Sequence, residues 1–153
     1  MRRAARGFTL LELMVVVALV ALGTAGATLA LRDGSATQLE REALRLSALL
    51  ESARAQSRTS GVPVVWRPLP QGFEFTGIRT STSTNATARD SLAGSRPWLD
   101  PQTRAQVVHP AGATTLVLGP EPLIAAQRVV LQLGERRLTL GTDGLAPFAV
   151  VTP

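Results

Sequence analysis

The stretch RGFTLLELMVVVALVALGTAGATLAL, residues 6–31, decides the fold class of this chain. From Phe8 to Leu31 it carries a single charged side chain, that of Glu12, and Arg32 and Asp33 follow it directly. A helix rises about 1.5 Å per residue, so a run of this length reaches across a hydrocarbon layer of about 30 Å. The sequence therefore predicts a transmembrane helix over residues 8–31.

The flanking charges predict how this segment is oriented. Arg2, Arg3 and Arg6 precede it, and the positive-inside rule then keeps the short N-terminus in the cytoplasm and exports the rest. A cleavable secretory signal would also have an arginine-rich start and an apolar middle, with Ala25-Gly26-Ala27 as its cleavage site. A plain membrane anchor and a twin-arginine export signal are further interpretations of the same residues.

Glu12 weighs against all three of these alternatives. An ionisable group inside an insertion segment costs roughly 2.5–3.5 kcal/mol, so a carboxylate at this depth needs a compensating partner. Intramembrane carboxylates are for this reason candidates for a functional role. We therefore interpret residues 8–31 as more than an anchor.

The segment Arg6-Gly7-Phe8-Thr9-Leu10-Leu11-Glu12-Leu13 resembles the processing site of type IV prepilins and type II secretion pseudopilins. The resemblance implies that residues 1–7 are a leader peptide. It implies that a prepilin peptidase cuts between Gly7 and Phe8 on the cytoplasmic side and methylates the new N-terminal Phe8. It also implies that Glu12 acts in the assembly of subunits into a filament.

Elementary electrostatics agrees with this implied role of Glu12. Cleavage would convert the uncharged amide nitrogen of Phe8 into an amine with a reference pKa of about 8, which is cationic at neutral pH. A carboxylate and an amine attract each other far more strongly in a low-dielectric medium than in water. The resemblance implies that the amine belongs to a neighbouring subunit, and a pair within one subunit is the alternative.

A second helical pattern lies in residues 32–61. Its apolar positions recur at helical spacing, while Arg41, Glu42, Arg45, Glu51 and Arg54 occupy the other faces. Gly61 and Pro63 are expected to end the helix. The apolar stripe consists of Leu39, Ala43, Leu46, Leu50 and Ala53.

Residues 62–153 predict an antiparallel β domain, because no βαβ alternation is present. One hairpin joins Val62–Arg67 to Phe73–Ile78 across Pro68–Gly72, and a second joins Arg128–Leu133 to Arg136–Leu140 across Gly134-Glu135. Weaker strands are expected at Val107-Val108, Thr114–Leu118 and Leu145–Val151.

Residues 79–106 are rich in Ser, Thr, Ala and Arg and predict one long loop, which is either a mobile functional loop or a disordered insertion. The fold class is therefore α+β, with a long N-terminal helix whose transmembrane half precedes an amphipathic half packed on an antiparallel β-sheet head.

The composition argues against an enzyme. The chain has no cysteine, no tyrosine and one histidine, His109, which stands beside Pro110 without a second histidine to complete a metal site. The aspartates show no calcium-loop spacing. We expect no catalytic residue, no cofactor and no metal. Trp66 is expected in the core or as surface cover, and Arg136-Arg137 as a solvent-facing pair.

The net charge is +5, and all basic residues are arginines. Three of them stand in the first six residues, which leaves 13 basic against 11 acidic residues, or +2. This balance argues against nucleic acid as a partner. A DNA-binding minor pilin is the rival interpretation, with Arg79, Arg89, Arg96 and Arg104 as its best remaining site.

The stretch LESARAQSRTSGVPVVW at residues 50–66, followed by GFEF at 72–75, resembles H-type minor pseudopilins and the FimT- and FimU-type minor pilins (the GspH/FimT family). Ala53-Arg54, and Gly144 before Pro147, add to this match.

The resemblance implies a minor pseudopilin near the tip of the periplasmic pseudopilus of the type II secretion system, supporting assembly and protein export across the outer membrane. Its implied partners are other minor pseudopilins, the major pseudopilin and the prepilin peptidase/methyltransferase. The implied location is the inner membrane, crossed once, with a periplasmic head. The alternative is a type IV minor pilin in pilus assembly or DNA uptake.

Overall fold

The structure is a computed structural model that describes residues 9–78 and 92–151, except for the side chains of residues 25–33. The chain divides into two compact units, residues 1–34 and residues 35–153. Each unit is described by itself below.

One helix, α1, spans Leu10–Ser60. It ends as the sequence predicts: Gly61 has a positive φ of 67°, and its N–H donates to the carbonyl of Ser57 at 2.9 Å. Glycine adopts this left-handed conformation without the steric penalty that a Cβ brings. Pro63 follows, which cannot continue a helix.

Two antiparallel sheets make up the rest of the second unit, which confirms the predicted α+β class with an antiparallel head. The first sheet has the strand order β3-β2-β1-β5. Its strands are β1 (Val64–Leu69), β2 (Gly72–Thr76), β3 (Gly94–Pro97) and β5 (Leu116–Leu118). The second sheet has the order β4-β6-β7-β8. Its strands are β4 (Arg104–His109), β6 (Gln127–Leu133), β7 (Arg136–Thr142) and β8 (Ala149–Val151).

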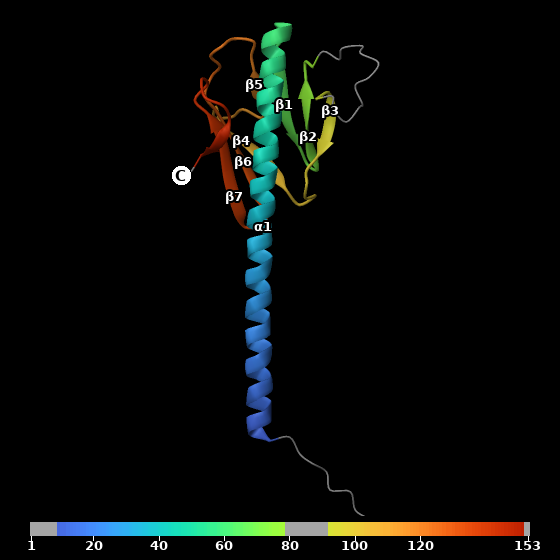
Figure 1. The fold of residues 1–153 in the computed structure, drawn as a ribbon, viewed down its shortest axis with the longest axis vertical. Helices are drawn as coiled ribbons and strands as arrows, with labels where there is room; N and C mark the ends of the chain where they lie inside the picture. The colour runs from blue at the N-terminus through green and yellow to red at the C-terminus, as the bar shows by residue number, and fades with distance from the viewer. Residues whose placement is uncertain (1–8, 79–91, 152–153) are drawn as a thin grey trace, which may run out of the picture. The chain divides into compact units, whose positions relative to one another are not determined.

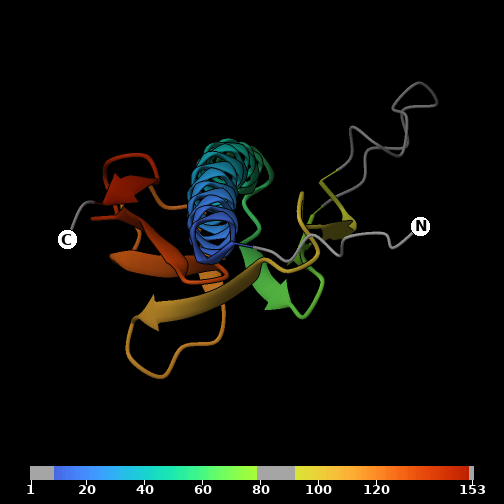
Figure 2. The ribbon, with the colours of Figure 1, turned by 90° about the horizontal axis from the view of Figure 1, so that it is seen from below.

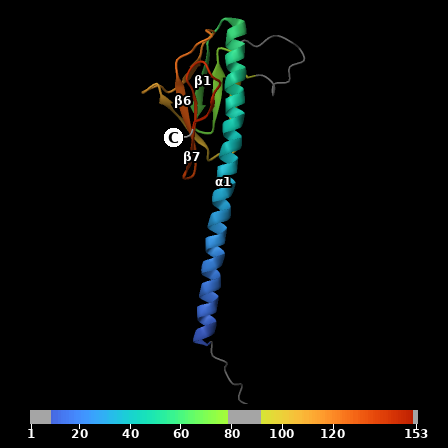
Figure 3. The ribbon, with the colours of Figure 1, turned by 60° about the vertical axis from the view of Figure 1, so that its left-hand side comes forward.

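Within this unit the helical residues 35–60 run alongside both sheets, with β6 and β7 on one side and β1, β2 and β3 on the other (Figure 1). Viewed along the helix, one sheet lies to the left of it and the other to the right (Figure 2). When the molecule is turned about the long axis of the helix, both sheets are seen to cover the same face of the helix (Figure 3). The stripe that the sequence predicts is the one that packs: all five of its members are at most 2% exposed, whereas Leu44 on the opposite face is 68% exposed.

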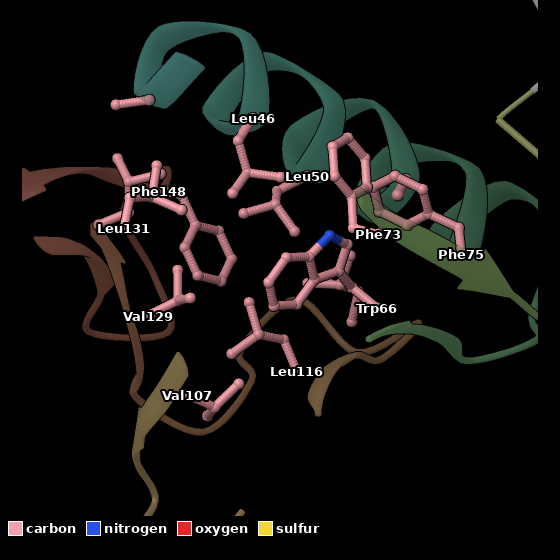
Figure 4. Packing of buried hydrophobic residues seen from close by; sticks show 14 of the residues in the cluster. Leu46, Leu50, Trp66, Phe73, Phe75, Val107, Leu116, Val129, Leu131 and Phe148 are labelled. Carbon is pink, nitrogen blue, oxygen red and sulfur yellow. The ribbon is translucent and has the colours of Figure 1, made fainter. Parts of the chain in front are cut away.

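The core joins the helix to both sheets. Leu46 and Leu50 point between Phe148 and Leu131 on one side and the aromatic rings of the first sheet on the other (Figure 4). Trp66 is fully buried, which confirms its expected place in the core, and its ring centroid lies 6.1 Å from that of Phe73.

A side chain also connects the two sheets. Gln127, at the start of β6, accepts a hydrogen bond from the N–H of Val117 at 2.7 Å and donates to the carbonyl of the same residue at 2.9 Å. Its amide thus satisfies backbone groups of β5 in the way a neighbouring strand would. The loops between β5 and β6 are held close to the core as a result.

The predicted loop over residues 79–106 differs from what the structure describes. Residues 79–91 lie outside the described residues, but Gly94–Pro97 forms β3 and Arg104 begins β4. The β3 segment has no strand-forming composition of its own. It pairs because Gly72 opposite it lacks a side chain: a Cβ there would lie 2.1 Å from the carbonyl oxygen of Arg96. Pro97 is tolerated because β3 is an edge strand.

Two further strand boundaries also shift. The first hairpin turn comprises only Pro70 and Gln71, since Leu69 pairs with Gly72. The predicted strand Leu145–Val151 is reduced to Ala149–Val151, because Asp143 organises the preceding residues into a turn. The second hairpin matches its prediction, with Leu133 opposite Arg136 and a positive φ of 57° at Gly134.

Candidate functional site

The predicted cleavage residues Gly7 and Phe8 lie outside the described residues, and the described chain begins at Thr9. Thr9 is the N-terminal cap of α1. Its Oγ1 accepts a hydrogen bond from the N–H of Glu12 at 3.2 Å, and its carbonyl accepts one from the N–H of Leu13 at 3.2 Å. A threonine in this position satisfies a backbone donor that the helix itself leaves unpaired.

Glu12 is exposed and occupies the first turn of α1. The free N–H groups at a helix start carry partial positive charge, which favours a carboxylate there. The threonine–glutamate spacing of three is that of a capping box, in which the glutamate side chain can also serve the cap residue. The Glu12 carboxylate is thus stabilised by the N-terminal end of the helix and, being exposed, is accessible to a cationic group of another molecule.

The helical residues after Glu12 expose apolar side chains in every direction. Each of the large apolar residues between Leu10 and Leu22 is at least 47% exposed. A helix that is apolar on all sides is typical of a segment surrounded by lipid or by other apolar chains. Within the described part of the chain, no helix is both long and apolar enough to cross a membrane.

A buried arginine joins α1 to the last part of the chain. Arg54 is 2% exposed. Its Nη2 donates to the carbonyls of Gly144 at 2.5 Å and Pro122 at 3.2 Å, and its Nη1 donates to Ala146 at 3.3 Å. Glu51 lies 4.0 Å from Nη1 and partly balances the buried charge. One side chain therefore holds two separate loops.

Two neighbouring helix residues bind the backbone of Phe148. The Glu51 carboxylate accepts from its N–H at 3.0 Å, and the hydroxyl of Ser47 donates to its carbonyl at 2.5 Å. The Phe148 ring is then inserted into the core, where it is 2% exposed. With the Arg54 contacts, these bonds make a polar clasp, the residues Ser47, Glu51 and Arg54, between the helix and residues 144–148.

A second polar contact fixes the other sheet. Glu42 is 1% exposed; it accepts from the N–H of Leu99 at 2.5 Å and from Arg45 at 3.1 Å. Arg45 also donates to the carbonyl of Pro97 at 3.2 Å, and its guanidinium carbon lies 5.6 Å from the centroid of the Phe73 ring. Glu42 and Arg54 lie outside the apolar stripe, as the sequence predicts, but both are buried against the head.

The turn that carries Gly144 is tightly constrained. Gly144 has a φ of 101°, and a Cβ there would lie 1.9 Å from the carbonyl oxygen of Ile124. The preceding Asp143 accepts hydrogen bonds from the N–H groups of Ala146 at 2.8 Å and Leu145 at 2.9 Å. These two bonds, Ala146 first, lower the pKa of the Asp143 carboxyl below its usual range, and the Arg54 charge adds to the effect.

The remaining sequence candidates are not brought together into a site. His109 is exposed at the end of β4. The four loop arginines are split, since Arg79 and Arg89 lie outside the described residues while Arg96 and Arg104 lie on different sheets. Within the described part of the chain no cluster of three or more His, Asp or Glu residues is arranged to hold a metal ion.

Sequence reasoning missed the clasp because its partners on the head are backbone N–H and C=O groups, which leave no trace in the residue pattern. The available signals were Ala53-Arg54 and Gly144 before Pro147, which the family resemblance singled out without relating them to each other. That Arg54 is the partner of the turn at Gly144 could not be deduced from spacing.

Comparison with known proteins agrees with this geometry. The sequence profile described as the prokaryotic N-terminal methylation motif matches residues 2–28. Two crystal structures of the type IV minor pilin FimU of Pseudomonas aeruginosa PAO1 resemble the fold. They have TM-scores of 0.53 and 0.51 and 12% sequence identity each, and cover 76% and 74% of this chain and 90% and 93% of theirs. No curated protein matches the chain closely enough to count as a relative.

The chain therefore combines the N-terminal methylation motif of prepilins with a pilin-like fold of one long helix and an antiparallel head. This is the class that the resemblance of residues 6–13 implied. At 12% identity the likeness to FimU concerns the fold alone.

Proposed function

We propose that this protein is a minor structural subunit of a pilin-like filament and has no enzymatic role. The observation that carries the proposal is the methylation motif over residues 2–28, which includes the start of α1. There the large apolar residues from Leu10 to Leu22 are all exposed, and the first helical turn holds one carboxylate, that of Glu12. A pilin-like head on the same helix supports it. Such a subunit requires an anchoring segment, an assembly contact and a rigid head.

In this proposal residues 1–7 are a leader, and prepilin peptidase cleaves between Gly7 and Phe8 and methylates Phe8. Residues 8–31 cross the inner membrane once, and the head lies in the periplasm. The Glu12 carboxylate binds the new amine of a neighbouring subunit. The polar clasp supports this arrangement, because it fixes the head to the helix that would transmit the packing of the filament.

More narrowly, we propose a minor pseudopilin of the type II secretion system, near the tip of the pseudopilus. Its partners would be the major and the other minor pseudopilins. This assignment rests on the H-type resemblance of residues 50–75, whose Arg54 contacts the turn at Gly144. The second candidate is a type IV minor pilin in pilus assembly or DNA uptake, which the likeness to FimU favours.

Intact-mass analysis of membrane-extracted protein tests the processing step. We expect loss of residues 1–7 and the gain of one methyl group on Phe8. A variant with Gly7→Val should keep the full length, because the proposed cut follows a glycine and a branched side chain would replace it directly before the scissile bond. A mature chain starting at Thr28 would instead identify an ordinary secreted protein and contradict the proposal.

Site-specific crosslinking in cells separates the two candidates. A photoreactive residue at position 44, which is exposed on the helix, would report the neighbours directly. Adducts with pseudopilins, together with loss of protein secretion when the gene is removed, support the secretion assignment. Adducts with pilins, together with loss of pili or of transformation, support the second candidate.

A further inference from the structure

The second sheet carries an unbalanced positive charge. Its four strands contain four arginines and one histidine and no aspartate or glutamate, and all four arginines are exposed. They are Arg104, Arg128, Arg136 and Arg137. Three ion pairs between described residues use other arginines: Arg45 with Glu42, Arg54 with Glu51, and Arg67 with Glu74 in the first sheet.

The strand register gathers part of this charge on one face. On β6, Val129, Leu131 and Leu133 point into the core, so the alternate residues face away from it. Gln132 pairs with Arg104 on β4 and with Arg137 on β7. These three residues therefore form one row across the outer face. Since neighbouring strands lie about 4.8 Å apart, the two arginine Cα atoms are about 10 Å apart.

The row lines a shallow groove of about 440 Å³. Its lining combines two valines with the amide groups of two glutamines and with two guanidinium groups. The principal lining residues are Arg104, Gln106, Val108, Val130, Gln132 and Arg137. We call this surface the basic groove.

The groove's donors are available and partly fixed in place. Arg104 uses Nη1 to donate to the carbonyls of Pro101 and Thr103, both at 2.9 Å, which leaves Nη2 and Nε free to bind. Gln132 donates to the carbonyl of Gly134 at 2.9 Å and retains its oxygen as an acceptor. Arg137 has neither a hydrogen bond nor an ion pair within the described part of the chain.

We propose that the basic groove is a docking site for an acidic segment of a partner protein. A guanidinium presents two parallel N–H groups that match the two oxygens of a carboxylate. The glutamine amides can bind peptide N–H and C=O groups, and the two valines of the lining can pack against an aliphatic side chain. The four strands of this sheet contain no carboxylate to balance their arginines, so the partner supplies them.

The lining favours a peptide over nucleic acid. No aromatic ring lines the groove, so unpaired bases would have nothing to stack on. Strong duplex binding rests on about 6–10 phosphate contacts, whereas the groove offers two guanidinium groups. The two valines of the lining would meet a sugar-phosphate backbone poorly but can pack against a peptide side chain. This inference holds for either of the two filament assignments.

Fluorescence anisotropy with the full chain in detergent micelles tests the proposal. The probes are a labelled decapeptide of alternating glutamate and valine, the same peptide with glutamine for glutamate, and a labelled duplex DNA of equal charge. Near physiological salt we expect binding of the glutamate peptide alone. Arg137→Gln should weaken it by about tenfold or more, since a charge-assisted hydrogen bond is lost. It should leave the protein folded, because Arg137 has no partner within the described residues.

Arg41→Gln is the matched control, because Arg41 is exposed on α1 and loses the same charge. Arg137→Lys keeps the charge but loses the planar guanidinium with its two parallel N–H groups. We expect it to recover less than half of the affinity for the glutamate peptide that Arg137→Gln loses. Absence of binding to the glutamate peptide, equal weakening by Arg41→Gln, or tighter binding of DNA that Arg137→Gln abolishes would each overturn the proposal.

Discussion

Arg54 on the helix donates a hydrogen bond of 2.5 Å to the carbonyl oxygen of Gly144, which lies 90 residues further along the chain. The same guanidinium reaches Pro122 and Ala146. A cation with 2% exposure is costly to bury, and three carbonyl dipoles and the carboxylate of Glu51 compensate it. The helix therefore positions the loops of the head, besides covering the core.

We expect residues 35–153 to fold without the N-terminal segment. Every residue of the buried core lies between Leu39 and Phe148, and the polar clasp lies inside the same range. The fragment should be soluble and monomeric, with a circular dichroism spectrum of mixed helix and strand and a cooperative thermal transition. A spectrum dominated by helix, or no transition, would contradict the described head.

Removing the buried guanidinium should destabilise this fragment strongly. Arg54→Ala leaves the carbonyls of Gly144, Pro122 and Ala146 without their donor, and we expect a loss of about 3 kcal/mol in the free energy of unfolding by urea. Arg54→Lys should lose less of the free energy of unfolding, because the lysine ammonium can replace some of the N–H donors of the guanidinium. The exposed Arg41→Ala is the control and should stay within about 0.5 kcal/mol of the parent. Equal effects at both positions would mean that the clasp contributes nothing.

Gly144 should tolerate no side chain. In Gly144→Ala the new Cβ would combine a φ of 101° with a contact of 1.9 Å to the Ile124 oxygen, so the turn must open. We expect a loss of at least about 2 kcal/mol. Gly134→Ala is the matched control, because Gly134 also has a positive φ but meets nothing within 4 Å. It should lose only about 1 kcal/mol, the cost of the left-handed conformation alone. Similar losses in both variants would refute the close approach.

Local features of this protein could be predicted from its sequence. The apolar residues from Leu39 to Ala53 recur at the spacing of a helix. The end of the helix at Gly61 and the turn at Gly134 follow from the ability of glycine to adopt a positive φ. Thr9 and Glu12 likewise stand three residues apart, so their capping relationship is local. Each of these signals involves residues that are close together in the chain.

Features that depend on distant segments could not be predicted. Glu42 and Arg54 look like surface charges until the backbone of residues 97–99 and 144–146 is brought to them. The β3 strand has no pattern of its own and exists because β2 offers it an edge. The basic groove arises only when the register places Arg104 and Arg137 on either side of Gln132. A sequence count of arginines had suggested no such surface.

Acid should weaken the turn at Asp143. Its pKa in the folded protein lies below the ordinary value of 3.8, because the N–H groups of Ala146 and Leu145 bind the ionised form. A lowered pKa stabilises the fold above 3.8, and this contribution disappears as the pH falls through the lower folded value. Urea unfolding of the head fragment at a series of pH values below 5 should show a smaller acid-induced loss for Asp143→Asn than for the parent. Parallel pH profiles would exclude this contribution.

Glu12 should serve assembly and not insertion. Glu12→Ala removes a charge that costs roughly 2.5–3.5 kcal/mol to insert, so the variant should enter the membrane at least as well as the parent. It should still be processed between Gly7 and Phe8, which intact mass will show. It should fail to join the filament, because the amine of a neighbouring Phe8 would be left unpaired at low dielectric. Breaking such a pair costs about 3 kcal/mol, or more than about a hundredfold in the association constant.

Glu12→Gln is the informative companion to this variant. It keeps the size of the side chain, and Thr9 still caps the helix through its own hydroxyl, so helix formation should not change. If the carboxylate acts by its charge, the glutamine variant should fail in crosslinking to neighbours as completely as the alanine variant. If the glutamine variant crosslinks as well as the parent, the side chain acts through its shape or its capping hydrogen bond. If both variants crosslink normally, Glu12 has another role and the proposed contact with the methylated N-terminus is wrong.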